Sequence, residues 1–297
     1  MDILFGKIRI YAMAGTQFTI TSSGGNVQTG TIPSGATFVD RIVPGLDEYT
    51  VSNGISNVNV SVNYGEMVKV QLYSSLDEVS WADIQTLIQE NKFADYFSVG
   101  ATKTFIVNGK TYTAEVVSIN DGTGAASQWY PEKTVDFIAK ELYETKYRYN
   151  ATNNNSGGFP SSEIKTTLNS TIYPLLPSDL KSVITAKSHS YQAGSYSSSW
   201  SSSMVTSSDN LWLPTYYEIA GGSAQYVEGE NVNNNKPYIL DSKIKMVNGE
   251  SSASLWWLGS PFSSNSTVFW GVSAGGGFIS YYGASNAYGV PLCFRIG

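Results

Sequence analysis

Histidine and cysteine are almost missing from this chain of 297 residues, which contains one of each. A single cysteine, Cys293, excludes an internal disulfide and any zinc site built from several thiolates. With His189 as the only histidine, a cluster of imidazole ligands is excluded, and a Ser-His-Asp triad would have to use that residue. His189 stands among serines, so we expect it in a surface loop without a catalytic role. The sequence predicts no metal site and no cofactor.

Charged side chains are also scarce, because Lys, Arg, Asp and Glu make up 14% of the chain against about a quarter in ordinary domains. A net charge of −6 argues against a nucleic acid as partner, since such proteins carry a basic face. No apolar run approaches the roughly 20 residues of a membrane span, so no membrane insertion is expected. The first residues, Met1–Arg9, include an acidic side chain and no long apolar run, which predicts no signal peptide.

Residues 1–72 predict a small all-β sandwich of immunoglobulin-like architecture. Short runs of alternating apolar and polar residues are separated by turns rich in Gly, Pro and Asn, which is the pattern of antiparallel strands. The clearest runs are Lys7–Tyr11, Phe18–Ile20, Asn57–Val62 and Met67–Leu72. We interpret this segment as a spacer or attachment domain.

Residues 73–297 predict a second domain of the α+β class. The pattern indicates a helix over Ser80–Asn91 and a hairpin over Thr104–Ile119 that turns at Asn108-Gly109. Val135, Ile138, Ala139, Leu142 and Tyr143 have helical spacing, so we expect a helix from Pro131 to Tyr149. Further expected elements are short helices from Ser162 and Pro177, a strand at Leu211–Leu213, and exposed loops over Ser188–Ser208 and Val227–Lys236.

The most informative segment is Ser251–Phe294, which has no Asp, Glu, Lys, Arg or His and is crowded with aromatic residues. Tyr and Trp supply rigid contact area, while Ser, Asn and Gly adapt their hydrogen bonds, as in antibody loops. Side chains that transfer protons near neutral pH are missing there, so the segment indicates binding and not catalysis. Of Trp256 and Trp257, neighbours on a strand, we expect one to be buried and the other to lie nearer the surface.

Carboxylates are the remaining catalytic option. Asp209 and Glu218 flank Leu211–Leu213 and would serve as the paired acids of a carbohydrate hydrolase if they faced one cleft. We favour the simpler interpretation, in which Asp209 caps a turn and Glu218 makes a buried structural contact.

The C-terminal motifs resemble a family. Trp256-Trp-Leu-Gly-Ser-Pro261, Phe269-Trp-Gly-Val272 and Gly289-Val290 are similar to signatures of a bacterial and phage domain. Asn155-Ser-Gly-Gly158 and Asp209-Asn-Leu-Trp212 match it upstream, and the resemblance covers about residues 73–297. That domain resembles the formylglycine-generating-enzyme type of C-type lectin fold, and many members look like the variable proteins of diversity-generating retroelements. Formylglycine generation needs a cysteine pair, and this chain has only Cys293.

The resemblance implies a ligand-binding face made by a variable region at about residues 253–290. In such systems a reverse transcriptase randomises adenines, and codons AAC and AAT altered in this way never encode Trp. Trp256, Trp257 and Trp270 are then scaffold. The implied variable positions are Ser263, Asn265, Thr267, Phe269, Gly271, Ser273, Gly275, Phe278, Ser280, Tyr281, Tyr282, Ser285 and Tyr288. At least two of the rings at Phe278, Tyr281, Tyr282 and Tyr288 are expected to be exposed.

The function expected from these features is non-catalytic recognition of a cell-surface protein or glycan. The resemblance places such a chain on a phage virion or a bacterial cell surface, as a receptor-binding protein or adhesin. Two alternatives stay open from the sequence. One is the hydrolase using Asp209 and Glu218, and the other is a structural virion protein whose aromatic segment is buried between subunits. The oligomeric state is not fixed by the sequence.

Overall fold

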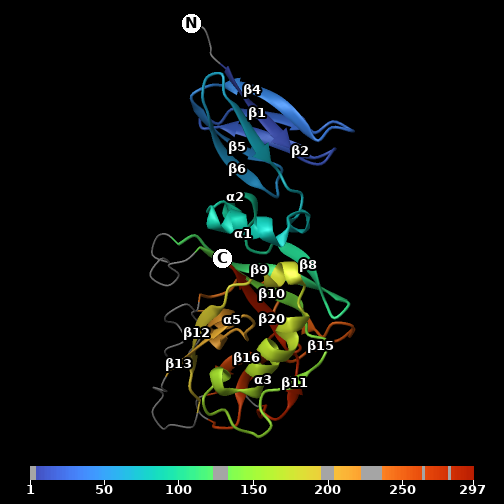
Figure 1. The fold of residues 1–297 in the computed structure, drawn as a ribbon, viewed down its shortest axis with the longest axis vertical. Coiled ribbons are helices and arrows are strands. Elements are labelled where there is room, and N and C mark those ends of the chain that lie inside the picture. Colours follow the sequence, from blue (N-terminus) through green and yellow to red (C-terminus); the bar gives the residue numbers. More distant parts are fainter. Residues whose placement is uncertain (1–4, 123–132, 195–203, 222–235, 263–264, 280–281) are drawn as a thin grey trace.

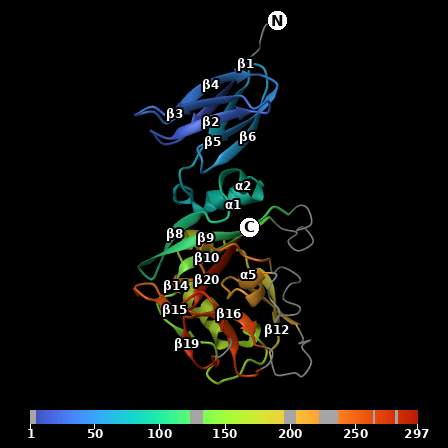
Figure 2. The same cartoon turned by 180° about the vertical axis from the view of Figure 1, so that it is seen from behind.

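The computed structural model describes residues 5–122, 133–194, 204–221, 236–262, 265–279 and 282–297. These residues form a mixed protein in which strands outnumber helices. The molecule is elongated, with the N-terminal sheets at one end, helices α1 and α2 in the middle, and the remaining sheets at the other end (Figures 1 and 2). The expected loop Val227–Lys236 lies outside the described residues except for Lys236.

The N-terminal strands form two sheets that face each other. One sheet has the order β4-β1-β7 and the other β3-β2-β5-β6, and all neighbours are antiparallel except β1 and β7. The strands are β1 (Phe5–Tyr11), β2 (Gln17–Ser22), β3 (Val27–Thr31), β4 (Phe38–Pro44), β5 (Asp47–Ser52), β6 (Asn57–Val62) and β7 (Met67–Gln71). Alternate side chains such as Ile8, Ile10 and Val51 fill the space between the sheets and are fully buried. The strands expected from the alternating runs are therefore confirmed.

The helix and the hairpin expected next are also confirmed. Helix α1 (Trp81–Gln89) begins after Ser80, whose hydroxyl accepts a hydrogen bond from the backbone N–H of Asp83 (3.1 Å). This N-cap satisfies one of the free N–H groups at the start of the helix. Strands β8 (Thr102–Val107) and β9 (Lys110–Asn120) then pair across Asn108-Gly109, both with positive φ (50° and 76°), as a type I′ turn requires.

The helix predicted from Pro131 to Tyr149 is wrong. Residues Thr134–Leu142 form a strand, β10, in the middle of the sheet β20-β10-β9-β8, with β20 spanning Pro291–Ile296. Both faces of β10 are covered, so buried residues follow one another from Thr134 to Ala139. A continuously buried stretch of this kind satisfies the helical spacing by accident, because periodicity does not separate a buried strand from a buried helix.

The prediction of a surface loop over Ser188–Ser208 is also wrong for the described residues. Strands β12 (Lys187–Gln192) and β13 (Met204–Asp209) form a hairpin, and residues 195–203 between them lie outside the described part. Leu211–Leu213, expected as a strand, makes only a single bridge, between Trp212 and Cys293. The short helices expected from Ser162 and Pro177 are confirmed as α3 (Glu163–Thr166) and α4 (Ser178–Lys181).

The remaining described elements are small and lie around the central sheet. They are α2 (Phe93–Tyr96), α5 (Tyr216–Ala220), β11 (Tyr147–Arg148), β14 (Lys245–Met246), β15 (Ala253–Ser254), β16 (Trp256–Pro261), β17 (Phe269–Val272), β18 (Phe278–Ile279) and β19 (Ala287–Tyr288), with 3-10 turns at Leu76–Glu78, Phe159–Ser161 and Tyr173–Leu175 and a π-helical turn at Thr167–Ile172. A large hydrophobic core joins them to the central sheet, and a separate core fills the N-terminal sandwich. Tyr96 packs against both cores.

Candidate binding surface and buried ionic network

The C-terminal aromatic segment forms the sheet β16-β17-β18, whose tryptophans are buried. Trp256 and Trp257 are both fully buried and Trp270 is 6% exposed, so the expectation that Trp256 or Trp257 lies near the surface is wrong. The sheet is covered on both faces, and the two indoles reach opposite neighbours. Trp256 Nε1 donates to Lys243 O (3.0 Å), and Trp257 Nε1 donates to Tyr147 O (2.9 Å).

The loops that follow β16 and β18 are fixed to the segment around Asn155. The side-chain Nδ2 of Asn155 donates to the carbonyls of Asn265 (2.7 Å) and Val268 (2.9 Å), and the backbone N–H of Asn155 donates to the carbonyl of Ser266 (2.8 Å). Two residues earlier, Asn153 Oδ1 accepts from the N–H and the hydroxyl of Ser285. Because these loops are held by hydrogen bonds from a neighbouring segment, their exposed side chains have a defined arrangement.

The structure divides the implied variable positions by exposure. Asn265, Gly275, Tyr282 and Ser285 are exposed, and Thr267, Ser273, Phe278 and Tyr288 are half-buried. Ser263, Ser280 and Tyr281 lie outside the described residues. At least two of the rings of Phe278, Tyr281, Tyr282 and Tyr288 were expected to be exposed. Among the described ones, Tyr282 is 38% exposed, and Phe278 and Tyr288 are half-buried.

The assignment of Phe269 and Gly271 to the ligand-binding surface is wrong, because both residues are buried. Phe269 is fully buried and stacks on Tyr149 with ring centroids 3.4 Å apart. Gly271 is buried in the middle of the sheet, between Trp257 on β16 and Ile279 on β18. Phe269 and Gly271 are two residues apart and so belong to one face of β17, but all four residues of this strand are buried, so neither face is open to a ligand.

The accessible positions fall into two groups. We call the first the distal loop surface: Asn265, Thr267, Tyr282, Ser285 and Tyr288. In it Thr267 O accepts from Ala284 N (2.9 Å), and the Tyr282 ring lies 4.8 Å from that of Tyr288. β19, which contains Tyr288, lies at the end of the molecule remote from the N-terminal sheets (Figure 2).

The second group is the β17–β18 turn with Ser273, Gly275 and Phe278. Phe278 packs on Tyr216 (4.6 Å between centroids), and Lys243 Nζ lies 5.0 Å from its ring. The four residues of β17 place Thr267 and Ser273, which flank this strand, roughly 13 Å or more apart at about 3.3 Å per residue. The structure therefore does not gather all the implied positions into one small patch.

The Asp209–Glu218 pair does not form the acids of an open cleft. Asp209 is 5% exposed, accepts a hydrogen bond from the Ser207 hydroxyl and lies 3.4 Å from Lys165 Nζ. Glu218 is fully buried, and its Oε2 accepts from the backbone N–H of Thr215 (2.8 Å), which completes a capping box at the start of α5. The expected buried structural contact of Glu218 is confirmed.

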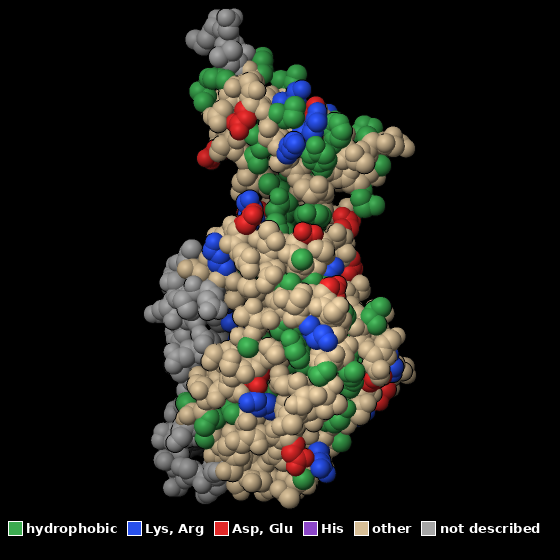
Figure 3. Space-filling model, viewed as in Figure 1, with side chains coloured by type: hydrophobic (Ala, Val, Ile, Leu, Met, Phe, Trp, Pro, Cys, Tyr) green, Lys and Arg blue, Asp and Glu red, His purple; other side chains and the backbone are tan. Residues whose placement is uncertain are grey.

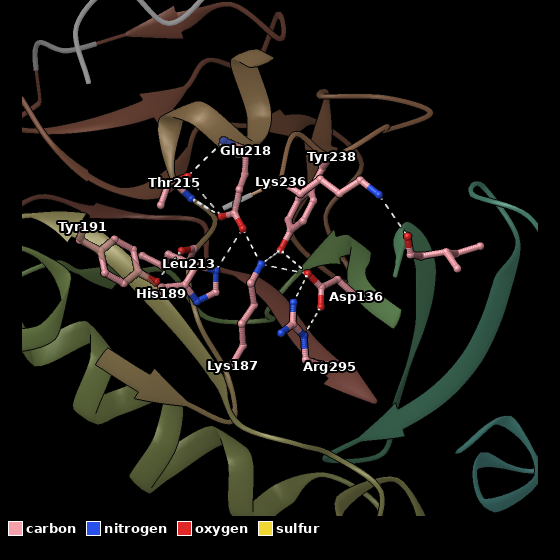
Figure 4. A network of polar contacts seen from close by, with 11 residues as sticks. Asp136, Lys187, His189, Tyr191, Leu213, Thr215, Glu218, Lys236, Tyr238 and Arg295 are labelled. Carbon is pink, nitrogen blue, oxygen red and sulfur yellow. Dashed lines mark hydrogen bonds and ion pairs between the residues drawn. The ribbon is translucent and has the colours of Figure 1, made fainter. Parts of the chain in front are cut away.

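Sequence reasoning missed the network around Glu218 (Figure 4). Lys187 Nζ donates to Glu218 Oε1 (2.6 Å), Asp136 Oδ2 (2.9 Å) and Tyr238 Oη (2.8 Å). Arg295 adds a bidentate contact to Asp136, at 2.6 and 3.1 Å. Lys187, Asp136 and Glu218 are at most 1% exposed, so this cluster of charges is enclosed in the core.

His189 completes the network and is not in a surface loop. It is 1% exposed, and its Nε2 lies 3.1 Å from Glu218 Oε1, so Nε2 carries the proton that the carboxylate accepts. Burial and the neighbouring Lys187 lower the pKa of His189 to about 4. Burial would raise the pKa of Glu218, but Lys187 and His189 outweigh it and lower the value to about 2.

At neutral pH the network is therefore electrically balanced. Two cations, Lys187 and Arg295, face two carboxylates, Asp136 and Glu218, and His189 is neutral. Buried charges are tolerated when they are paired and hydrogen-bonded, and removing one partner leaves a costly isolated charge. The cluster has the features of a structural element that ties β10, β12, α5 and β20 together.

Two patterns could have indicated this network. Lys187 and His189 are two residues apart on one strand and so point to the same face. Thr215-x-x-Glu218 is the sequence pattern of a capping box. Among the described residues, no group of three or more His, Cys, Asp or Glu is arranged to hold a metal ion. In the same part of the chain, no helix has the length and apolar character needed to cross a membrane.

Comparison with known proteins gives one match. No curated protein and no solved structure matches the chain. A family model matches residues 133–297, which contain β10 to β20, the buried ionic network and the whole aromatic segment. Because this match covers more than half of the 297 residues, the chain belongs to the family described as a domain of unknown function, DUF6273.

Proposed function

We propose that this chain is a non-catalytic ligand-binding protein whose distal loop surface contacts the ligand. The observation that carries the proposal is the contrast within Ser251–Phe294: its tryptophans are buried, while uncharged Asn, Ser and Tyr side chains are exposed on loops that Asn153 and Asn155 hold in place. A rigid scaffold with small polar and aromatic groups outward is the arrangement that antibody paratopes use.

The uncharged surface also restricts the kind of ligand. Asn265, Thr267 and Ser285 offer hydrogen bonds, and Tyr282 offers a ring face, but no side chain in Ser251–Phe294 carries a formal charge. Recognition would then rest on stacking and neutral hydrogen bonds, which suit a glycan or the surface of a protein. Binding at this surface would depend little on salt, because its own side chains are uncharged and the exposed Arg148 opposite Ala287 is paired with Glu163.

The finer proposal is that residues 73–297 are a C-type-lectin-like domain of a diversity-generating retroelement variable protein. Residues 1–72 would be an immunoglobulin-like spacer, and the protein would act on a phage virion or a bacterial surface. The resemblance of the Trp256–Pro261 and Phe269–Val272 motifs supports this origin. The burial of Asp209 and Glu218 removes the support for the hydrolase alternative.

The DNA around the gene tests the retroelement origin. The proposal predicts a reverse-transcriptase gene beside a near-copy of the segment that encodes about residues 253–290. The copies should differ only where the template has adenine, and the differing codons should include those of exposed positions such as Asn265 and Tyr282. The codons of Trp256, Trp257 and Trp270 should be identical. A locus without such a copy, or differences spread over the tryptophan codons, would contradict this origin.

A further inference from the structure

The two outer faces of the N-terminal sandwich differ in composition. On the sheet β3-β2-β5-β6 the outward positions are mainly Thr, Ser and Asn, which is an ordinary solvated face. We call the opposite one the β4-β1-β7 face: its outward positions are Phe5, Lys7, Arg9, Tyr11, Phe38, Asp40, Ile42, Pro44, Met67, Lys69 and Gln71. In Figure 3, hydrophobic and basic side chains gather over the part of the molecule where β1 and β4 lie.

Large apolar side chains on the β4-β1-β7 face are open to solvent. Ile42 is 63% exposed, Phe5 51% and Met67 43%. They lie on neighbouring strands of one sheet face: Ile42 on β4 and Met67 on β7 are on either side of Lys7 on β1, and Phe5 is two residues before Lys7. Large apolar side chains exposed together on one sheet face, with the apolar stem of Lys7 between them, are the composition of a surface that a partner covers.

The centre of this face is ordered before any partner arrives. Arg9 forms a bidentate pair with Asp40, with Nε–Oδ1 at 2.7 Å and Nη2–Oδ2 at 3.0 Å. Its guanidinium lies 4.3 Å from the centroid of the Phe38 ring, and that ring lies 5.5 Å from Tyr11. Aromatic residues, Met and Arg are the types enriched at protein interfaces, and side chains already fixed lose little entropy on binding.

The charge of the face selects the partner. Lys7, Arg9 and Lys69 against Asp40 give 3 − 1 = +2, in a chain whose net charge is −6. Two copies meeting through this face would bring like charges together, which disfavours a symmetric dimer. A partner that presents carboxylates beside apolar side chains is complementary in both respects.

We propose that the β4-β1-β7 face is a docking site for a different protein, through a segment that carries acidic and apolar residues. This site is separate from the distal loop surface, which lies at the other end of the molecule (Figure 1). The N-terminal sandwich would then attach the chain to this partner protein, and the C-terminal loops would stay accessible to a ligand.

The test uses the full chain and a displayed library of random peptides as the probe. We expect the enriched peptides to combine Asp or Glu with Leu, Phe or Trp, and to bind more weakly as salt is raised. Ile42→Ser should weaken their binding about tenfold or more, as expected for an interface hot spot. Val27→Ser is the matched control, because Val27 is 59% exposed on the opposite outer face, and it should leave binding unchanged.

Four results would overturn the proposal. One is that peptides without acidic residues are enriched, and another is that Ile42→Ser and Val27→Ser bind the peptides equally well. The third is a mass in solution that shows a dimer in the native chain and a monomer in Ile42→Ser, since a second copy would then be the occupant. The fourth is binding to phosphatidylserine vesicles that Ile42→Ser abolishes, which would make the partner a membrane. Ile42 is exposed, so its replacement is not expected to unfold the sandwich, and far-UV circular dichroism of both variants checks this.

Discussion

Replacement of the only histidine should remove one clearly defined part of the pH dependence of stability. In the folded protein the pKa of His189 is lowered to about 4, because the ring is buried beside Lys187. In the unfolded chain the value returns to about 6.5. Between these two values the unfolded chain binds a proton that the folded protein does not, so the free energy of unfolding falls as the pH falls.

The size of this effect follows from the difference between the two pKa values. Each pH unit inside the window contributes about 1.4 kcal/mol, so the native protein should lose about 2 kcal/mol between pH 7 and pH 5. Carboxylates contribute little in this range, since in the unfolded chain they titrate near pH 4. In His189→Gln, which is neutral at every pH, the loss should disappear.

Urea unfolding followed by tryptophan fluorescence measures this free energy at each pH. All seven tryptophans lie beyond residue 80, and the signal reports the C-terminal core through Trp81, Trp212, Trp256, Trp257 and Trp270, of which Trp212 contacts His189. Tyr191→Phe on the same strand is the control: it removes the hydrogen bond to Leu213 O (3.2 Å) but no titrating group in this range. It should lower stability and keep the pH dependence. An unchanged slope in His189→Gln, or a flat native profile between pH 7 and pH 5, would refute the burial of a neutral His189.

Three further predictions concern the C-terminal core. Lys187→Met should cost about 3–5 kcal/mol of unfolding free energy, since it leaves the buried Glu218 without its main cation, and a cost below 1 kcal/mol in urea unfolding would contradict the network. Gly259→Ala should lower the free energy of unfolding by about 1–3 kcal/mol, because a Cβ there would lie 2.5 Å from the Tyr191 ring and 2.8 Å from Leu213 O. Gly275→Ala is the control: a Cβ at this position has no close neighbour, so the free energy of unfolding should change by less than about 0.5 kcal/mol. Burial raises the pKa of the Cys293 thiol, so a disulfide reagent should label it only as fast as the core unfolds; rapid labelling in native buffer would show that it is accessible.

Local patterns predicted those elements whose two faces have different surroundings. The N-terminal strands alternate because one side of each sheet meets solvent, and α1 has a polar cap and a single apolar stripe. Prediction failed where both faces are covered, as in β10, since the period carries no information there. It also failed at β12, where Ser-His-Ser resembled a low-complexity loop although His189 is buried against Glu218 and Trp212.

The candidate surface was predictable in composition but not in layout. The absence of charge in Ser251–Phe294 and the outward position of Asn265 and Ser285 agree with a binding segment. Which rings point outward depends on long-range contacts, such as Phe269 against Tyr149, more than 100 residues away in the chain. Sequence spacing alone does not contain that information.

The central claim is that the distal loop surface binds the ligand, and a glycan and cell-surface-protein array tests it most directly. The array would be probed with the native chain, with Tyr282→Ala, and with Tyr64→Ala as the control, because Tyr64 is 48% exposed at the other end of the molecule. We predict that native binding to at least one array component is lost or weakened about tenfold in Tyr282→Ala, persists in Tyr64→Ala, and changes little with salt. Equal binding by both variants, or binding by none of the three proteins, would contradict the account.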